Sequence, residues 1–135
     1  SGFDPMDNIF KLGDFGNCFI SKVVNIDVSE GDSRYLGKEA LEIFDGNVLA
    51  SDTSVSLPST CSDIFALGLT TAEYCGCGDL PNCGETWQII RTGLLPKISA
   101  SFSSELNILL TKMISPECIY RPTASDCFSN EFIRD

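Results

Sequence analysis

The sequence contains no histidine, few cations and no long apolar run, and each absence narrows what the chain can do. Nine lysines and arginines stand against 19 aspartates and glutamates, which gives a formal net charge of −10. The cations are scattered along the chain and form no cluster. This argues against a protein that binds the phosphate backbone of nucleic acid. No apolar stretch approaches the roughly 18 residues of a membrane span, and no basic leader precedes an apolar segment at the amino end. We therefore expect a soluble protein that binds no nucleic acid.

Seven cysteines are present, an odd number without the regular spacing of a secreted disulfide framework. We therefore expect reduced thiols and an intracellular setting. Cys75, Cys77 and Cys83 lie close enough in sequence to raise the alternative of a zinc-binding module. Their spacing does not give two CxxC pairs, and no histidine is available to complete a site. A helix end and a surface loop with reduced thiols are therefore favoured over zinc.

The clearest element in this chain is a helix over residues 62–74. The chain has 135 residues and 43% hydrophobic content, which suits one domain with a real core. Apolar residues cover most of the wheel of this helix, as is typical of a helix enclosed by protein. Ser62 is placed to cap its start, and Asp63 lies in the positive field of its first amide groups. Gly76 marks its end.

Shorter helical patterns follow this central helix. One runs from Glu85 to a stop at Gly93. The next is predicted to be capped by Ser103 or Ser104 and to end at Pro116. The polar stretches over residues 45–61 and 77–84 are predicted to be loops.

Two charged residues far apart in sequence are predicted to meet. Glu39 lies in a short helix beside apolar neighbours, and a buried carboxylate requires a cationic partner. Arg121, in a turn before the last predicted helix, is the obvious candidate. Thr123 and Asp126 have the spacing of a capping box for that last helix.

Near the amino end, an alternating pattern from Phe10 predicts a short strand that runs into a turn at Gly16. This turn presents Asp14. An aspartate at such a place is commonly only a turn former, so the residues of this turn alone do not decide its function.

Four short motifs, taken in chain order, resemble the carboxyl half of a protein kinase domain. They are Asp14-Phe15-Gly16, Glu39, Asp63 with Gly68, and Arg121-Pro122. The stretch Glu30-Gly31-Asp32-Ser33-Arg34-Tyr35-Leu36 is similar to the activation segment of the Wee and Myt kinases. These cell-cycle inhibitory kinases phosphorylate a tyrosine on cyclin-dependent kinases. Residues 63–70 and 84–98 resemble the central helix and the next helix and loop of the same family.

The resemblance implies a mainly α fold, the helical carboxyl-terminal lobe of the protein kinase fold. Short strands would flank the Asp-Phe-Gly turn, and the lobe would be incomplete at its amino-terminal side. One partial kinase domain would span residues 1–135. Residues 1–16 would hold the end of the catalytic loop and the Asp-Phe-Gly turn, 17–41 the activation segment, and 62–135 the helical lobe.

The resemblance also implies ATP and Mg²⁺ as cofactors of the complete kinase. Asp14 and Asn8 would bind the Mg²⁺ that bridges the ATP phosphates. Phe15 would pack beneath Asp14, and Gly16 would let the turn flip. An ungapped alignment puts another residue where the catalytic base belongs, so Asp4 is the candidate for a displaced base.

The remaining roles implied by the resemblance concern the substrate loop and its supports. Asp63 would hydrogen-bond the backbone of the catalytic loop, and the Glu39–Arg121 ion pair would lie under the substrate loop. Asp32 would replace an activating phosphate by pairing with Arg34, the alternative being two solvated charges. The activation and substrate loop would comprise Glu30, Gly31, Asp32, Ser33, Arg34 and Tyr35.

Several parts of an active kinase are absent from the sequence. It has no Gly-rich loop and no lysine paired to a helix glutamate, and Asp4 precedes Asn8 by four residues instead of five. Because phosphoryl transfer depends on positioned charges around ATP, we expect the chain alone to be inert. An apolar wheel needs cover on every side, so removal of the upstream helices should leave one face of the central helix exposed. The expected partners are ATP and a cyclin-dependent kinase, in the nucleus or cytoplasm. The alternative is a non-catalytic, pseudokinase-like binding module.

Overall fold

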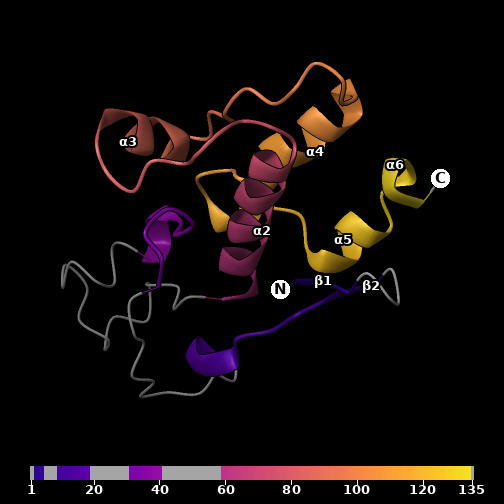
Figure 1. Cartoon of the computed structure of the whole chain (residues 1–135), viewed down its shortest axis with the longest axis horizontal. Helices are drawn as coiled ribbons and strands as arrows, with labels where there is room; N and C mark the ends of the chain where they lie inside the picture. The colour runs from indigo at the N-terminus through magenta and orange to yellow at the C-terminus, as the bar shows by residue number, and fades with distance from the viewer. Residues whose placement is uncertain (1, 5–8, 19–30, 41–58, 135) are drawn as a thin grey trace. The chain divides into compact units, whose positions relative to one another are not determined.

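The computed structural model describes residues 2–4, 9–18, 31–40 and 59–134 and divides the chain into two compact units, residues 1–31 and 32–135 (Figure 1). Two of the predicted site residues, Asn8 and Glu30, lie outside the described residues. Most of the predicted loop over residues 45–61 lies outside them as well.

The first unit contains an antiparallel hairpin followed by a tight turn. Strands β1 (Gly2–Asp4) and β2 (Ile9–Lys11) pair so that Phe3 lies opposite Phe10. The predicted strand overlaps β2, whereas β1 was not predicted. The 3-10 helix η1 (Phe15–Asn17) follows β2.

The second unit is built mainly from helices in its described part. Its longest helix is α2 (Thr60–Tyr74), and residues 38–40 are also helical. The remaining elements are α3 (Glu85–Arg91), α4 (Ser104–Met113), η2 (Cys118–Tyr120), α5 (Ala124–Phe128) and α6 (Glu131–Arg134). The mainly α fold class predicted from the sequence is confirmed. No helix in the described part of the chain is long and apolar enough to span a membrane.

Helix α2 is the centre of the core of this second unit. In one cluster, Ile64 and Ala72 pack against Leu109 and other residues of α4. In a second cluster, Phe65 and Leu69 are completely buried and pack with Ile90 of α3 and its neighbours. Figure 1 shows α2 with α3 and α4 on either side of its upper end. The two clusters together fix α2 as the element from which the other helices are positioned.

Gly68 sets how closely α2 approaches the end of α4. A methyl group at this position would lie 3.0 Å from Met113 Cβ and 3.0 Å from Ile114 Cγ2. These contacts are tighter than most carbon–carbon contacts, so a larger residue at position 68 would require Met113 and Ile114 to move by a few tenths of an ångström.

One stripe of α2 is open. The exposed residues recur at helical spacing, so they share one face, and Leu67 is 53% and Tyr74 81% exposed. The full set is Thr60, Asp63, Leu67, Thr70 and Tyr74. Helix α2 is therefore not buried on every side, although its apolar wheel suggests that it would be. The open stripe agrees with the expectation that one face of the helix is exposed in this chain.

The start of α2 differs from the prediction. The helix begins two residues before Ser62, and Ser59 is its N-cap residue, without a side-chain cap hydrogen bond. The Ser62 hydroxyl instead donates to Glu39 Oε1 at 2.8 Å. Ser62 therefore lies inside the first turn of the helix, and its hydroxyl bonds a carboxylate from another segment.

The end of α2 is formed by glycine, as predicted. Gly76 has a φ of 87°, in the left-handed region that glycine enters without strain. The Cys77 amide donates to the Ala72 carbonyl at 3.1 Å, and the Gly76 amide donates to the Glu73 carbonyl at 2.9 Å. These two bonds form a Schellman motif, which satisfies carbonyls that would otherwise lack donors.

Two other predicted caps are confirmed. The Ser103 hydroxyl accepts a hydrogen bond from the Leu106 amide at 3.2 Å, which fixes the start of α4. Thr123 and Asp126 form a complete capping box at the start of α5. This turn follows Arg121 directly, so the cap also fixes the chain segment that carries that arginine.

Candidate functional site

The turn that carries Asp14 follows strand β2 in the first unit. Asp14 has a φ of 59°, a left-handed conformation that non-glycine residues adopt at some cost in energy. Its side chain is exposed, and so is Gly16. A carboxylate oxygen on an exposed turn is the kind of hard ligand that Mg²⁺ prefers. Phe15 is 64% exposed, and its packing beneath Asp14 stays a prediction from the kinase resemblance.

Asp4, the candidate displaced base, belongs to the same unit. It is the last residue of β1 and pairs with Ile9 of β2 in the hairpin. Asp63 belongs to the second unit and lies in the first turn of α2, on the open stripe. Desolvation by neighbouring groups raises the pKa of the Asp63 carboxyl, although the side chain as a whole is exposed.

The segment from Asp32 to Tyr35 forms a turn that is stabilised by an ion pair and a backbone hydrogen bond between Asp32 and Arg34. Arg34 Nη2 lies 2.6 Å from Asp32 Oδ2, and the Arg34 amide donates to Asp32 Oδ1 at 3.0 Å. Side-chain and backbone hydrogen bonds from Arg34 hold the pKa of Asp32 below its usual value. The two side chains are 46% and 42% exposed, so water screens this pair. Of the two alternatives considered from the sequence, an ion pair and two solvated charges, the structure contains the ion pair.

Tyr35 ties the same turn to α2. Its hydroxyl donates to Glu73 Oε2 at 2.5 Å, and the Glu73 hydrogen bond raises the pKa of the phenol. The second oxygen of Glu73 accepts from the Leu80 amide at 3.3 Å. One carboxylate therefore connects the turn, the central helix and the loop before α3.

Arg91 of α3 holds the backbone of this turn from the other side. Its guanidinium donates to the carbonyls of Ser33 at 2.7 Å, Arg34 at 2.8 Å and Leu36 at 3.1 Å. The indole of Trp87 donates to the Ser33 carbonyl at 2.9 Å. Arg91 is only 5% exposed, and burial lowers its pKa to about 10. These bonds fix the path of the chain through residues 33–36, and we call this cluster the Arg91 clamp.

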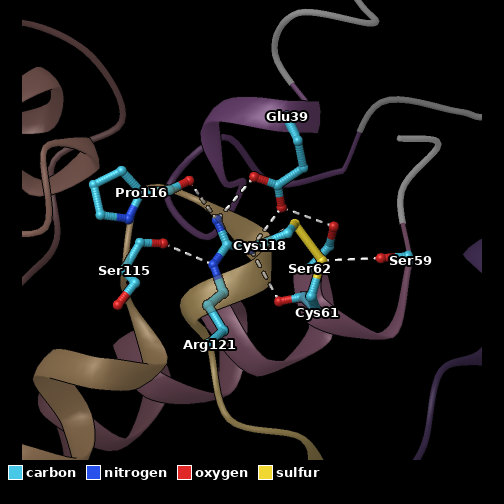
Figure 2. Close-up of a disulfide and its surroundings, with 8 residues drawn as sticks. All are labelled: Glu39, Ser59, Cys61, Ser62, Ser115, Pro116, Cys118 and Arg121. Atoms are coloured by element: carbon cyan, nitrogen blue, oxygen red, sulfur yellow. Dashed lines mark hydrogen bonds and ion pairs between the residues drawn. A yellow bond between two sulfur atoms is a disulfide. The ribbon is translucent and has the colours of Figure 1, made fainter. Parts of the chain in front are cut away.

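Glu39 and Arg121 form an ion pair at the end of the same segment (Figure 2). Arg121 Nη1 donates to Glu39 Oε1 at 2.7 Å, and Nη2 donates to Oε2 at 2.9 Å. This is the two-point geometry in which guanidinium and carboxylate match best. Burial alone would raise the pKa of Glu39, but hydrogen bonds from Arg121 and Ser62 hold it below its usual value.

Arg121 uses its remaining donors on backbone carbonyls. It donates to Ser115 at 2.8 Å, to Cys61 at 3.0 Å and to Pro116 at 3.2 Å. Arg121 is 6% exposed and 4.8 Å from the centre of the Phe65 ring. The Arg121 side chain therefore joins α2, the chain after α4 and the end of residues 32–40, which we call the turn-bearing segment. We call this cluster the Arg121 corner.

A disulfide between Cys61 and Cys118 lies beside the Arg121 corner. It joins the first turn of α2 to η2 (Figure 2). The sequence predicted reduced thiols because no cysteine spacing suggests this pair, and the expectation is wrong at these two positions. Five further cysteines are free, including Cys75, Cys77 and Cys83.

Among the described residues, one cluster has ligand-type atoms close enough together to hold a metal ion. Its members are Glu39, Cys61 and Cys118, whose ligand atoms lie within 4.8 Å of one another. Both sulfurs are already bonded to each other, and the carboxylate is paired with a cation. The zinc alternative drawn from Cys75, Cys77 and Cys83 does not coincide with this cluster.

Sequence reasoning missed Arg91, Trp87, Glu73 and the cysteine pair. A weak signal existed for Arg91, because it directly follows two apolar residues in the last turn of a short amphipathic helix. Its acceptors are backbone carbonyls, and these carry no signature in a sequence. Glu73 carries no such signal, because nothing in the sequence indicates that it meets Tyr35.

No family model matches the chain. Known proteins do match it. The chain is 40% identical over 116 residues to Wee1-like protein kinase 2 of Sus scrofa and 35% identical over 126 residues to Wee1-like protein kinase 2 of Homo sapiens. It is 34% identical over 126 residues to Wee1-like protein kinase 2 of Xenopus tropicalis. These matches cover 86% of this chain in the first case and 93% in the others. They cover 18% to 20% of the relatives, so the chain spans about a fifth of their length.

Proposed function

Because this chain belongs to the Wee family of protein kinases and corresponds to the carboxyl-terminal lobe of their kinase domain, we propose that its parent protein transfers the ATP γ-phosphate to a tyrosine of a cyclin-dependent kinase. The tyrosine is the inhibitory one, and its phosphorylation restrains mitotic entry. This chemistry belongs to the nucleus or cytoplasm, where ATP and cyclin-dependent kinases are present.

The observation that supports this proposal most is the fixed turn over residues 32–36. The Arg91 clamp holds its carbonyls, Tyr35 ties it to α2, and the Arg121 corner fixes the helical residues that follow it. An acceptor peptide is phosphorylated efficiently only when a loop holds it in one position relative to ATP. The Asp32 carboxylate pairs with Arg34 within the turn, as an activating phosphate would, and needs no phosphorylation to do so.

In the complete kinase, Asp14 and Asn8 would supply oxygen ligands to Mg²⁺, and the ion would neutralise charge on the ATP phosphates. Asp14 has the required chemistry because its carboxylate is exposed on a turn. Asp4 remains the candidate for a displaced base. Asp63 would accept hydrogen bonds from the catalytic-loop backbone, and its place on the open stripe of α2 leaves it facing away from the core.

The chain alone is expected to be inert. It has no Gly-rich loop and no phosphate-binding lysine with its helix glutamate, so charged groups that stabilise the transition state are missing. Incubation with Mg²⁺, ATP and a peptide bearing the inhibitory tyrosine should give no phosphate transfer. Reproducible transfer that Asp14→Asn abolishes would contradict this expectation.

A chimera tests the proposed activity directly. The upstream part of the kinase domain of the Homo sapiens relative is joined to this chain in place of the matching segment. We expect tyrosine phosphorylation of the peptide, and we expect Asp14→Asn to abolish it. Asp79→Asn, which changes an exposed aspartate in the loop before α3, is the matched control and should leave the activity unchanged.

The second candidate function is a non-catalytic, pseudokinase-like module that binds a cyclin-dependent kinase. The open stripe of α2 favours it, because exposed Leu67 and Tyr74 suit a protein partner. A folded but inactive chimera, together with a melting temperature that Mg²⁺ and ATP do not shift, would favour this module over the kinase. An active chimera would exclude it.

A further inference from the structure

The disulfide between Cys61 and Cys118 joins two segments that are 57 residues apart in sequence. Their Cα atoms are 5.6 Å apart, a usual separation for a bonded pair. Helix α2 and η2 each hold one of the two cysteines in place by backbone structure. We therefore expect the fold to keep the two sulfurs close to each other after the bond is reduced.

Two donors point at these sulfurs. Arg121 Nη1 lies 3.5 Å from Cys118 Sγ, and the Ser59 hydroxyl lies 2.9 Å from Cys61 Sγ (Figure 2). The thiolate is the form of cysteine that reacts with oxidants, and both donors are placed to bond to the sulfur in that form. Both cysteines are also partly exposed, so small molecules can reach them.

The five free cysteines have different surroundings. Desolvation raises the pKa values of the Cys75, Cys77 and Cys127 thiols, and this keeps them protonated and unreactive. Cys18 and Cys83 are exposed, and neither is bonded to another cysteine. Among the cysteines that the structure describes, Cys61 and Cys118 alone combine a bonded partner, nearby donors and access.

We propose that Cys61 and Cys118 form a reversible oxidation site. A peroxide oxidises the two thiols to the disulfide, and two glutathione-type thiols reduce it again and become a disulfide themselves. The Cys118 thiolate attacks one peroxide oxygen and breaks the O–O bond, which gives a sulfenic acid and water after protonation. The Cys61 thiolate then attacks that sulfur, forms the S–S bond and releases a second water. Two thiols and one peroxide thus give one disulfide and two waters.

The closed bond acts on the Arg121 corner. Arg121 lies three residues after Cys118 and donates to the Cys61 carbonyl, so the disulfide fastens the segment carrying Arg121 to the start of α2. Glu39, at the end of the turn-bearing segment, is held by the same arginine. Oxidation therefore stiffens the support of the substrate loop, and reduction leaves that support to hydrogen bonds and the ion pair.

Reversibility rests on the proposed function, because ATP and cyclin-dependent kinases are found where thiols are kept reduced. Disulfides in such compartments are usually transient or redox-sensing. The oxidation test itself uses neither ATP nor a kinase substrate. A failure of the site can therefore be distinguished from a failure of the proposed activity.

The test begins with the whole chain after full reduction. Hydrogen peroxide is added in amounts up to one equivalent, free thiols are alkylated, and peptides are mapped by mass spectrometry. We expect one linked peptide pair, Cys61 with Cys118, while Cys18 and Cys83 remain alkylated. The double variant Cys61→Ser with Cys118→Ser should form no such bond, and Cys83→Ser should form it normally.

The oxidised chain is then treated with an excess of reduced glutathione. We expect the bond to open completely, the far-UV circular dichroism to stay helical and the melting temperature to fall by roughly 10 °C. Amide exchange should become faster around Arg121 and Glu39 and remain unchanged in α3. The double serine variant should melt near the temperature of the reduced chain under either treatment.

Several results would overturn the proposal. One is oxidation spread over all seven cysteines, and another is a bond that glutathione does not open. A reduced chain that unfolds would show that the fold requires the bond. Zinc bound by Glu39, Cys61 and Cys118 in the reduced chain, with oxidation blocked, would identify a metal site in its place.

Discussion

Arg121 and Arg91 are the buried charged residues of the described part of the chain, and they are stabilised in different ways. Arg121 is paired with a carboxylate, Glu39, at two points. Arg91 contacts the carbonyls of Ser33, Arg34, Leu36 and Trp87 and lies over the Trp87 ring at 4.2 Å. One cation is neutralised by an ion, and the other is solvated by dipoles and a π face.

The difference shows what each region does for the turn over residues 32–36. The Arg121 corner joins segments that are 82 residues apart, so it fixes where the end of this region lies. The Arg91 clamp acts on successive carbonyls, so it fixes the shape of the turn itself. We therefore expect loss of the Arg121 corner to destabilise the whole second unit. Loss of the Arg91 clamp should mainly affect the turn over residues 32–36.

Removal of Glu39 should have the largest effect. Glu39→Ala leaves the Arg121 cation buried without its counter-ion, which costs about 3–5 kcal/mol in the free energy of unfolding. Urea denaturation followed by circular dichroism measures this change. Glu131→Gln, an exposed glutamate in α6, is the control and should change stability little. A loss below about 1 kcal/mol for Glu39→Ala would show that water reaches this pair.

A double variant tests how much of this effect comes from the unpaired charge. Glu39→Leu with Arg121→Met removes both charges and should recover only part of the loss. Full recovery is not expected, because the carbonyls of Ser115, Pro116 and Cys61 lose their donor. Complete recovery would mean that the carbonyl bonds contribute little.

Removal of Arg91 should have a smaller effect on stability and a clear local one. Arg91→Met is expected to lower the free energy of unfolding by about 2 kcal/mol, since charged hydrogen bonds to carbonyls are lost. Hydrogen exchange should become faster at the amides of residues 33–36. Lys112→Met changes an exposed cation on α4 and serves as the control. Equal exchange in both variants would contradict the clamp.

Acid should affect the Arg121 corner and leave the Arg91 clamp intact. The pKa of Glu39 in the folded state lies below its ordinary value of 4.5. The stability from this ion pair is therefore complete above that value and is lost as the pH falls through the lower folded pKa. The difference in melting temperature between the parent chain and Glu39→Ala should shrink as the pH is lowered through this window. The corresponding difference for Arg91→Met should stay constant, because Arg91 remains charged in acid.

The exposed pair of Asp32 and Arg34 should give the smallest effect. Both side chains are more than two-fifths exposed, and salt screens such pairs. Asp32→Asn should therefore leave the melting temperature almost unchanged at physiological salt. A loss as large as that for Arg91→Met would show that the turn depends on its own charges more than on the clamp.

Sequence patterns predicted most of the helices and several of their ends. The helix around Phe65, the caps at Ser103 and Thr123 and the glycine stop at Gly76 all depend on neighbours a few residues away. Such signals are local, so a sequence carries them. The contact between Glu39 and Arg121 was also accessible, because a carboxylate among apolar neighbours requires a cation and few were available.

By itself, then, the sequence determined the helical character of the second unit, its local caps and the need for one buried charge pair. Only the tertiary structure decided that Arg91 holds the turn, that Tyr35 meets Glu73 and that Cys61 bonds Cys118. Backbone carbonyls look the same at every residue, and seven cysteines allow many pairings. Such contacts depend on distances between segments far apart in the chain, and folding alone sets those distances.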